Sequence, residues 1–206
     1  MAQSARIVLI DNVDSFSYNL VDELRQLGYP LVIYRNQLAA QDVIDQLESY
    51  SGSQLVCLSP GPGHPSKAGN LMEVIRYCSG RIPMLGICLG FQALIEHAGG
   101  RVDTCGEIVH GKTAKVDTVQ HPVFTAATDN NQCVVARYHS LSGYDLPATA
   151  TVIASLNGPD GIIPMAAEFT DSHSIGFQFH PESLLTPKGK QLLSNSVQYL
   201  LTGAKP

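Results

Sequence analysis

The hydrophobic and polar positions of the chain follow two alternating periods over its first hundred residues. Continuous apolar runs, typical of strands buried on both faces, fall at residues 7–10, 31–34, 55–58 and 84–87. Apolar positions at helical spacing, with polar residues between them, fall at residues 20–27, 43–50, 70–78 and 89–97. Strands and helices that alternate with short links predict an α/β fold, namely an open, mostly parallel sheet flanked by helices.

The pattern changes after residue 100, where short apolar runs typical of strands become frequent. These runs fall at residues 134–137, 151–154, 166–169 and 175–179. We expect them to add antiparallel strands to the sheet in the C-terminal half of the chain. A last helix is predicted from the spacing of Leu192, Leu193, Val197, Leu200 and Leu201. Because no repeat, low-complexity tract or linker interrupts this pattern, residues 1–206 are predicted to form a single domain.

Composition and charge narrow the classes of function. A chain of 206 residues with 44% hydrophobic side chains can bury a full core. The formal net charge of −5 argues against binding to nucleic acid or to an anionic membrane surface, because both repel an acidic protein. The sequence also lacks a membrane-spanning apolar run and a signal-peptide pattern. Five cysteines without a C-x-x-C pair favour a reduced cytoplasmic protein, and neither a metal nor a cofactor is expected.

One cysteine lies where the fourth predicted strand gives way to a helix. The spacing Gly86-x-Cys88-x-Gly90 matches the G-x-S-x-G nucleophile elbow, with sulfur in place of oxygen. Ligands of open parallel sheets bind beyond the carboxyl ends of the strands, which is where Cys88 is predicted to lie. The following helix N-terminus would stabilise a thiolate. The alternative is a buried core cysteine beside glycines that allow close packing.

A cysteine nucleophile needs a base, and His180 is the best candidate. It falls at the end of the strand predicted at 175–179, on the same edge of the sheet as Cys88. Glu182, two residues later, would place its carboxylate on the same side as the imidazole and orient the ring. Taken singly, His180 could be an ordinary strand-end histidine and Glu182 an acidic residue of a surface turn. An elbow and a strand-end His-x-Glu in one chain favour catalysis.

A glycine- and proline-rich loop, Ser59-Pro-Gly-Pro-Gly63, follows the third predicted strand. Glycine allows backbone N–H groups to approach a ligand closely. The loop could therefore direct the Gly61 N–H, together with that of Leu89, at a developing oxyanion, and one such donor contributes on the order of 3 kcal/mol to transition-state stabilisation. The alternative is an ordinary proline-rich turn. A phosphate-binding loop is disfavoured, because neither the P-loop pattern nor G-x-G-x-x-G is present.

Four separated motifs together resemble those of the class I (triad) glutamine amidotransferases. In chain order they are SPGPG at 59–63, GICLGFQ at 86–92, YHSL at 138–141 and FHPES at 179–183. The resemblance covers essentially the whole chain. Within the class, DNVDSFSYNL at 11–20 and ARYHSL at 136–141 are most similar to the glutaminase subunits of anthranilate synthases, followed by those of aminodeoxychorismate synthases.

The resemblance implies a role for each matching residue. Cys88 would attack the side-chain amide of L-glutamine and form a γ-glutamyl thioester, His180 would transfer protons, and Glu182 would orient His180. The substrate and its oxyanion would contact the loop residues Gly61, Pro62 and Gly63, the backbone of Leu89, Ser140 and Leu141, and the side chain of Gln92.

The resemblance also implies a partner. The enzymes resembled hydrolyse glutamine and pass ammonia to a separate chorismate-binding large subunit, in a hetero-oligomer. Nothing precedes the first predicted strand and the sequence stops after one final helix, so we expect the acceptor site on such a partner, from either anthranilate or aminodeoxychorismate synthesis, or from both. A non-catalytic regulatory module of the same fold is the alternative from another class, and the intact Cys88, His180 and Glu182 argue against it. A stand-alone cysteine peptidase or γ-glutamyl hydrolase is a further alternative.

One position departs from the family pattern, since many relatives carry histidine where this chain has Phe91. This residue is expected near the partner interface or in the packing of the elbow. The patch His110-Gly-Lys112 is interpreted as interface or ammonia-route lining. The other cysteines are expected to be inert. Structural or surface roles are assigned to the remaining histidines, which are His64, His97, His121, His139 and His173.

Overall fold

The computed structural model describes residues 4–106, 109, 111–158 and 161–203. Within these residues, nine strands form one sheet in the order β2-β1-β3-β4-β11-β10-β9-β6-β7, and β5 and β8 form a separate two-stranded sheet. The strands are β1 (Arg6–Asp11), β2 (Leu31–Arg35), β3 (Gln54–Leu58), β4 (Met84–Ile87), β5 (Arg101–Thr104), β6 (Lys112–Thr118), β7 (Gln132–Arg137), β8 (Leu141–Tyr144), β9 (Ala150–Gly158), β10 (Gly161–Phe169) and β11 (Ser174–Phe177).

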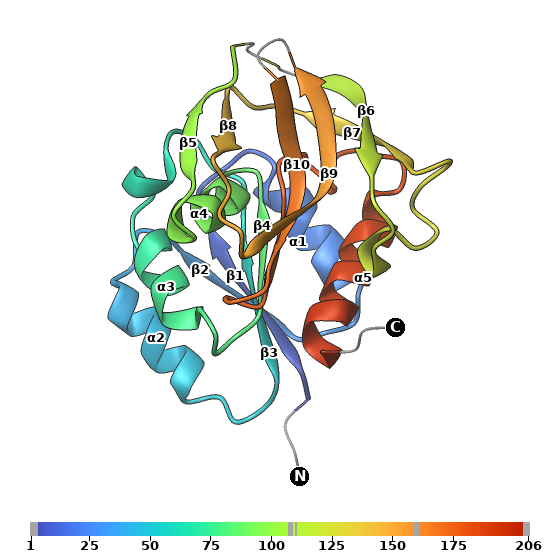
Figure 1. Cartoon of the computed structure of the whole chain (residues 1–206). Helices are drawn as coiled ribbons and strands as arrows, with labels where there is room; N and C mark the ends of the chain where they lie inside the picture. The colour runs from blue at the N-terminus through green and yellow to red at the C-terminus, as the bar shows by residue number, and fades with distance from the viewer. Residues whose placement is uncertain (1–3, 107–108, 110, 159–160, 204–206) are drawn as a thin grey trace.

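The helices follow the strands as the sequence predicted. They are α1 (Ser17–Arg25), α2 (Ala40–Glu48), α3 (Leu71–Cys78), α4 (Leu89–His97) and α5 (Gly189–Thr202), with short 3₁₀ helices η1 (Pro65–Lys67) and η2 (Pro122–Phe124). Figure 1 shows α2, α3 and α4 on one side of the parallel strands and α1 and α5 on the other. This arrangement gives the sheet a helical layer on both faces, as parallel strands require.

Each helical layer encloses its own hydrophobic core against the sheet. On one face, Leu20 and Leu24 of α1 and Leu192 and Leu193 of α5 pack against alternate residues of the strands. On the other face, the buried residues of α2, α3 and α4 pack against the intervening strand residues, such as Val8. The continuous apolar runs therefore supply both cores, because successive side chains of a strand point to opposite faces.

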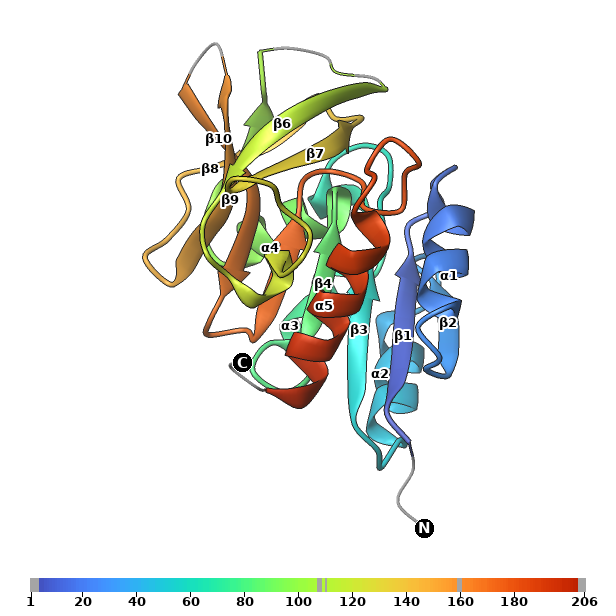
Figure 2. The same cartoon turned by 90° about the vertical axis from the view of Figure 1, so that its right-hand side faces the viewer.

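The sheet is divided into a parallel and an antiparallel part. Strands β2, β1, β3, β4 and β11 pair in parallel. Strands β10, β9, β6 and β7 continue the sheet by antiparallel pairing. Figure 2 shows β6 and β7 at the end of the molecule toward which the parallel strands run. The predicted fold class, a mostly parallel sheet with antiparallel strands added in the C-terminal half, is confirmed.

Three strands were not predicted, and one was predicted too long. Strands β5, β6 and β8 lie in segments for which the apolar pattern indicated no strand. The predicted strand 175–179 ends at Phe177, so Gln178 and Phe179 belong to the loop that leads to His180. Within the residues described, no helix is long and apolar enough to cross a membrane.

Candidate active site

The candidate nucleophile sits in a strained turn between β4 and α4. Cys88 has φ 49° and ψ −99°, a conformation that L-residues rarely adopt and that costs about 1–3 kcal/mol. A Cβ on Gly86 would lie 2.7 Å from the carbonyl oxygen of Gly90, and one on Gly90 would lie 2.6 Å from the Cβ of Leu58. Both glycines are therefore needed because the turn folds against itself and against β3. These are the features of a nucleophile elbow.

The parallel pairing of β11 with β4 brings His180 to the same edge of the sheet. The Cys88 N–H donates to the carbonyl oxygen of Phe177, the last residue of β11, at 2.7 Å. The His180 N–H donates to the Ala136 carbonyl at 3.1 Å, and the Thr186 hydroxyl donates to the His180 carbonyl at 2.7 Å. These bonds fix the loop after β11 against β7, so that the histidine is held by three segments of the chain.

His180 and Glu182 form a closely bonded pair. Nδ1 of His180 lies 2.7 Å from Oε1 of Glu182, and their side chains are 3% and 0% exposed. A carboxylate on Nδ1 fixes the tautomer in which Nε2 is the nitrogen that accepts a proton from the nucleophile. Nε2 of His180 and Oε2 of Glu182 are both buried and have no hydrogen-bond partner among the described residues.

The charges around His180 favour its protonated form. Burial opposes the positive charge, but the interaction with Cys88, and then that with Glu182, outweighs it and raises the pKa of His180 well above its usual value. A histidine that shares its proton with a neighbouring thiol is the electrostatic signature of a cysteine–histidine pair.

Two aromatic rings hold the imidazole from its sides. The ring of Phe16 lies 5.0 Å from that of His180, and the ring of Tyr138 lies 5.1 Å away in an edge-on arrangement. Phe16 and Tyr138 also contact each other at 4.6 Å. The sequence analysis assigned no role to either residue, although both lie in motifs on which the resemblance rests. The three rings therefore form one aromatic cluster around the imidazole.

The loop after β3 is fixed by asparagine contacts at the ends of the first three strands. The Asn12 N–H donates to Ser59 Oγ at 2.8 Å, the Asn12 side chain donates to the Ser59 carbonyl at 2.9 Å, and Asn36 donates to Asn12 Oδ1 at 3.2 Å. Gly61 lies directly against Leu89, because a Cβ on Gly61 would be 2.5 Å from Leu89 Cδ2. The predicted pairing of Gly61 with Leu89 therefore matches their positions, and their role stays a prediction.

The other residues predicted for the glycine-rich loop and for substrate binding differ in their exposure. Pro62 and Gly63 lie on the exposed part of the loop, where Gly63 has φ +78°. The Gln92 side chain is 3% exposed and donates through Nε2 to the Leu141 carbonyl at 3.0 Å. The carbonyl of the exposed residue Ser140 accepts from the Cys105 N–H at 3.0 Å. The structure thus brings Gln92 and Leu141 together, although they are far apart in sequence.

Gln178 is a residue of the site that the sequence analysis missed. It is fully buried, and its Nε2 lies 3.7 Å from Cys88 Sγ. The predicted strand 175–179 would have made it an ordinary strand residue. Its position two residues before His180, directly before the motif FHPES at 179–183, was the available signal.

Several residues outside the triad can now be placed. Phe91 belongs to the packing of the elbow, because it is fully buried and lies 6.2 Å from the ring of Phe169. His139 is 3% exposed, so it is a core residue rather than a surface one. Lys112 begins β6 and is exposed, whereas His110 lies outside the described residues.

The other cysteines are buried and form no disulfide among the described residues. Burial, with a smaller contribution from Glu182, raises the pKa of Cys57. Burial likewise raises the pKa of Cys78 to about 12 and that of Cys133 to about 11. A raised pKa leaves little thiolate near neutral pH, so these side chains are poor nucleophiles. That the chain needs no metal or cofactor stays a prediction.

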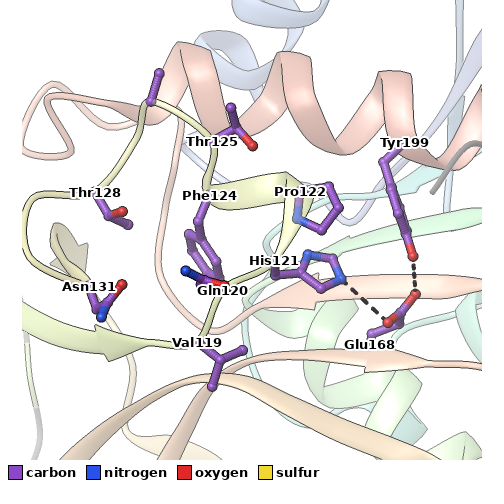
Figure 3. Close-up of a pocket in the computed structure, with 11 residues that line it drawn as sticks. Val119, Gln120, His121, Pro122, Phe124, Thr125, Thr128, Asn131, Glu168 and Tyr199 are labelled. Atoms are coloured by element: carbon purple, nitrogen blue, oxygen red, sulfur yellow. Dashed lines mark hydrogen bonds and ion pairs between the residues drawn. The ribbon is translucent and has the colours of Figure 1, made fainter. Parts of the chain in front are cut away.

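A pocket of about 710 Å³ lies apart from the candidate active site, and none of the predicted site residues lines it. It is lined by Asn131, by Glu168 of β10, by Tyr199 of α5 and by most residues of the segment 119–128. Figure 3 shows His121 and Tyr199 converging on Glu168. His121 Nε2 lies 3.4 Å from one carboxylate oxygen, and the Tyr199 hydroxyl donates to the other at 2.7 Å. Both carboxylate oxygens are thus occupied within the fold.

Relatives with known names match the chain over nearly its full length. It is 42% identical over 197 residues to the anthranilate synthase component 2 of Vibrio parahaemolyticus, covering 96% of this chain and 97% of that protein. It is 43% identical over 197 residues to the protein of the same name from Haemophilus influenzae, covering 96% and 98%.

The fold is shared with a crystal structure of a glutamine amidotransferase from Thermotoga maritima, at 19% identity and a TM-score of 0.69, covering 96% of this chain and 98% of that one. The family model described as class-I glutamine amidotransferase matches residues 8–199, which include Cys88, His180 and Glu182. The chain therefore belongs to the class I glutamine amidotransferases.

Proposed function

We propose that this protein hydrolyses L-glutamine to glutamate and ammonia at Cys88, for a separate synthase subunit. The observation that carries the proposal is the arrangement at the edge of the sheet. A cysteine in a strained elbow lies beside a buried histidine, which is bonded at 2.7 Å to a buried glutamate. A nucleophile, a base and an orienting carboxylate are the three groups that acyl transfer from an amide requires.

The first half of the proposed reaction forms a thioester. His180 Nε2 takes the proton of the Cys88 thiol, and Sγ attacks the δ-carbon of the glutamine side-chain amide. The negative charge moves to the amide oxygen, which the N–H groups of Gly61 and Leu89 stabilise. When the carbon–nitrogen bond breaks, His180 returns the proton to the leaving nitrogen, and ammonia departs. The product on the enzyme is a γ-glutamyl thioester of Cys88.

The second half releases glutamate. His180 takes a proton from a water molecule, which attacks the thioester carbon, and Sγ leaves as the thiolate. Glu182 holds the ring in one orientation through both halves and stabilises its positive charge. Gln92, Ser140, Leu141 and the loop Gly61, Pro62 and Gly63 surround the substrate, with the α-amino and α-carboxylate groups held by Gln92 and by the backbone at Ser140 and Leu141.

The partner we propose is the chorismate-binding large subunit of an anthranilate synthase, so that the ammonia serves tryptophan biosynthesis. The support is that relatives covering almost the whole chain at 42–43% identity are named component 2 of that enzyme. Buried cysteines that form no disulfide among the described residues suit the reducing cytoplasm as the place of action.

The experiment is to measure glutamate release by the purified chain in three conditions: alone, with an anthranilate synthase large subunit, and with an aminodeoxychorismate synthase large subunit. We expect stimulation by the first partner. Stimulation by the second alone would move the chain to folate synthesis, and stimulation by both would indicate a shared subunit. If a folded chain releases no glutamate with either partner, the catalytic proposal is wrong.

The division of labour is tested with Cys88→Ser. We expect this variant to lose glutamine-dependent anthranilate synthesis, while the complex still uses added ammonia. Equal loss of both activities would contradict the proposal, because the serine variant would then have damaged the partner's site rather than the ammonia supply.

A further inference from the structure

A line of buried polar groups, Gln178 and Gln92, leads from the Cys88 thiol to the Leu141 carbonyl. Gln178 Nε2 lies 3.7 Å from Cys88 Sγ, and Gln178 Oε1 lies 3.2 Å from Gln92 Nε2. Gln92 Nε2 also donates to the Leu141 carbonyl at 3.0 Å. Both glutamine side chains are at most 3% exposed. Buried amides of this kind retain a fixed hydrogen-bond pattern, because an unmade bond is costly in the interior.

The direction of these hydrogen bonds follows from one group, the Leu141 carbonyl oxygen, which can only accept. The atom of Gln92 that faces it must therefore be the amide nitrogen. The atom of Gln178 that faces this nitrogen must then be its oxygen, so the remaining atom, which faces Cys88, is the Gln178 nitrogen. The positions of the nitrogen and the oxygen in each side-chain amide are thus fixed by the neighbouring group.

The Leu141 carbonyl is itself held by a histidine of fixed tautomer. The Arg137 side chain, which can only donate, lies 3.1 Å from His139 Nε2. This nitrogen must accept, so the proton of the neutral ring is on Nδ1, which donates to the Leu141 carbonyl at 3.0 Å. The arrangement therefore begins at Arg137 on β7 and ends with an N–H directed at the sulfur.

We propose that Gln178 is a positioning residue that holds an amide N–H against the Cys88 sulfur and thereby stabilises the thiolate and its orientation toward substrate. This inference rests on the proposed role of Cys88 as the nucleophile. An N–H donor favours the negative form of the sulfur over the neutral thiol, since hydrogen bonds to charged acceptors are the stronger ones. Glutamine suits the position because it accepts from Gln92 and donates to Cys88 at once.

The same line connects the thiol with the substrate site. The side-chain hydrogen bonds of Gln92 to described residues use only its nitrogen, so its Oε1 can still accept from an amino group, which is where the α-amino group of glutamine is proposed to bind. Substrate held there would contact the same amide that is hydrogen-bonded to Gln178. Gln178 therefore lies between the proposed substrate site and the nucleophile.

The test is the pH dependence of Cys88 alkylation by iodoacetamide, followed by mass spectrometry of the Cys88 peptide without substrate or partner. The titratable group that interacts with the thiol is His180. Two further titratable groups contact His180, namely Glu182 at Nδ1 and Tyr138 at the ring edge. Gln178→Met keeps the length of the side chain but removes the donor. We expect it to move the profile upward by about one pH unit, from the usual strength of a hydrogen bond to a charged group.

Two further variants sharpen the test. Gln178→Glu keeps the acceptor toward Gln92 and directs an oxygen at the sulfur, so its profile should move at least as far as that of Gln178→Met. Gln54→Met is the matched control, since Gln54 is bonded to Arg6 at 2.9 Å at the start of β3. It should leave the Cys88 profile unchanged. If Gln178→Met and Gln54→Met gave the same profile as the wild type, the positioning role would be wrong.

A measurement on the wild-type chain avoids the risk that a Gln178 variant fails to fold. The ¹⁵N–¹H signals of the Gln178 side-chain amide should shift with the titration of Cys88, and this shift should vanish in Cys88→Ala. If the Gln178 side-chain signals did not change as Cys88 is titrated, the inference would be wrong. If the inference about Gln178 failed but Cys88→Ser still abolished glutaminase activity, the proposed function would stand. Retention of activity by Cys88→Ser would instead refute the proposed function.

Discussion

Two of the histidine–glutamate pairs in the described part of the chain, His180–Glu182 and His121–Glu168, differ in how the same two groups behave. In the active-site pair, Nδ1 of His180 lies 2.7 Å from Glu182, and the two side chains are 3% and 0% exposed. In the pocket pair, Nε2 of His121 lies 3.4 Å from Glu168, and the side chains are 10% and 23% exposed. The first pair leaves a histidine nitrogen for chemistry, whereas the second uses both.

The difference lies in what the second nitrogen of each ring contacts. Nε2 of His180 has no hydrogen-bond partner in the described part of the chain, and the interaction with Cys88 raises the pKa of this ring. Nδ1 of His121 accepts the Val123 N–H at 3.3 Å, which caps η2. A histidine–glutamate pair is thus a catalytic unit only when one ring nitrogen remains for a nucleophile.

The largest expected effect comes from breaking the active-site pair at its histidine. His180→Gln removes the base and the proton donor, so we expect glutamine hydrolysis by the complex to fall by about 10³-fold or more. His121→Gln is the matched variant, and it should leave hydrolysis unchanged. Steady-state glutamate release measures both, with thermal unfolding as a check that each variant is folded. Equal losses in the two variants would show that the pairs do not differ in function.

The second-largest effect on activity is expected from substitution of Glu182. Glu182→Gln keeps the shape of the side chain but presents an amide to His180, which disturbs the tautomer and the charge on the ring. We expect kcat to fall by about 10²- to 10⁴-fold. Glu168→Gln should preserve kcat, because the carboxylate of Glu168 bonds to His121 and Tyr199 in the pocket and not to a residue of the proposed triad. A normal kcat in Glu182→Gln would show that the Glu182 carboxylate has no part in the mechanism.

The raised pKa of His180 predicts a pH dependence of stability. Burial lowers this pKa, but the interactions with Cys88 and Glu182 raise it further, so the folded chain holds the proton to higher pH than the unfolded one. The stabilisation from the protonated ring is fully present below the unfolded pKa of about 6.5 and is lost as pH rises through the folded pKa.

Urea unfolding across this range measures the effect. The difference in unfolding free energy between wild type and His180→Gln should be largest below the unfolded pKa and should decrease at alkaline pH. Cys88→Ala should move the decrease to lower pH, because it removes the main stabilising interaction. A difference that stays constant with pH would contradict the predicted shift.

The smallest effect is expected at the pocket pair. Tyr199→Phe removes the hydroxyl that donates to Glu168 at 2.7 Å, and we expect the free energy of unfolding to fall by about 1 kcal/mol. Activity should be unchanged. Denaturant unfolding and glutamate release of this variant separate the two roles, and a loss of activity without a loss of stability would mean that the pocket acts on the active site.

The sequence predicted the parts of the protein whose signals are local. The apolar runs of β1 to β4 are buried on both faces, so their pattern is continuous and easily recognised. The elbow at Cys88 was predictable because its two glycines are dictated by contacts within four residues and with β3. His180 and Glu182 were predicted from their spacing, and the structure places them together.

The rest of the site depends on contacts between distant segments. Strand β6 was missed because most of its side chains are exposed or partly exposed, so its sequence KTAKVDT lacks a continuous apolar run. Phe16, Tyr138 and Gln178 meet at the active site from three separate loops or strand ends. No periodicity along the chain records such a meeting, because it is produced by the order of the strands in the sheet.

The most direct test of the central claim is to trap the covalent intermediate. The complex with the anthranilate synthase large subunit would be mixed with isotopically labelled glutamine, quenched in acid during turnover and digested for mass spectrometry. We predict a labelled γ-glutamyl group on the Cys88 peptide in the wild type and its absence in Cys88→Ser. A folded, active complex that carries the label on another residue, or turns over glutamine without Cys88, would contradict the account.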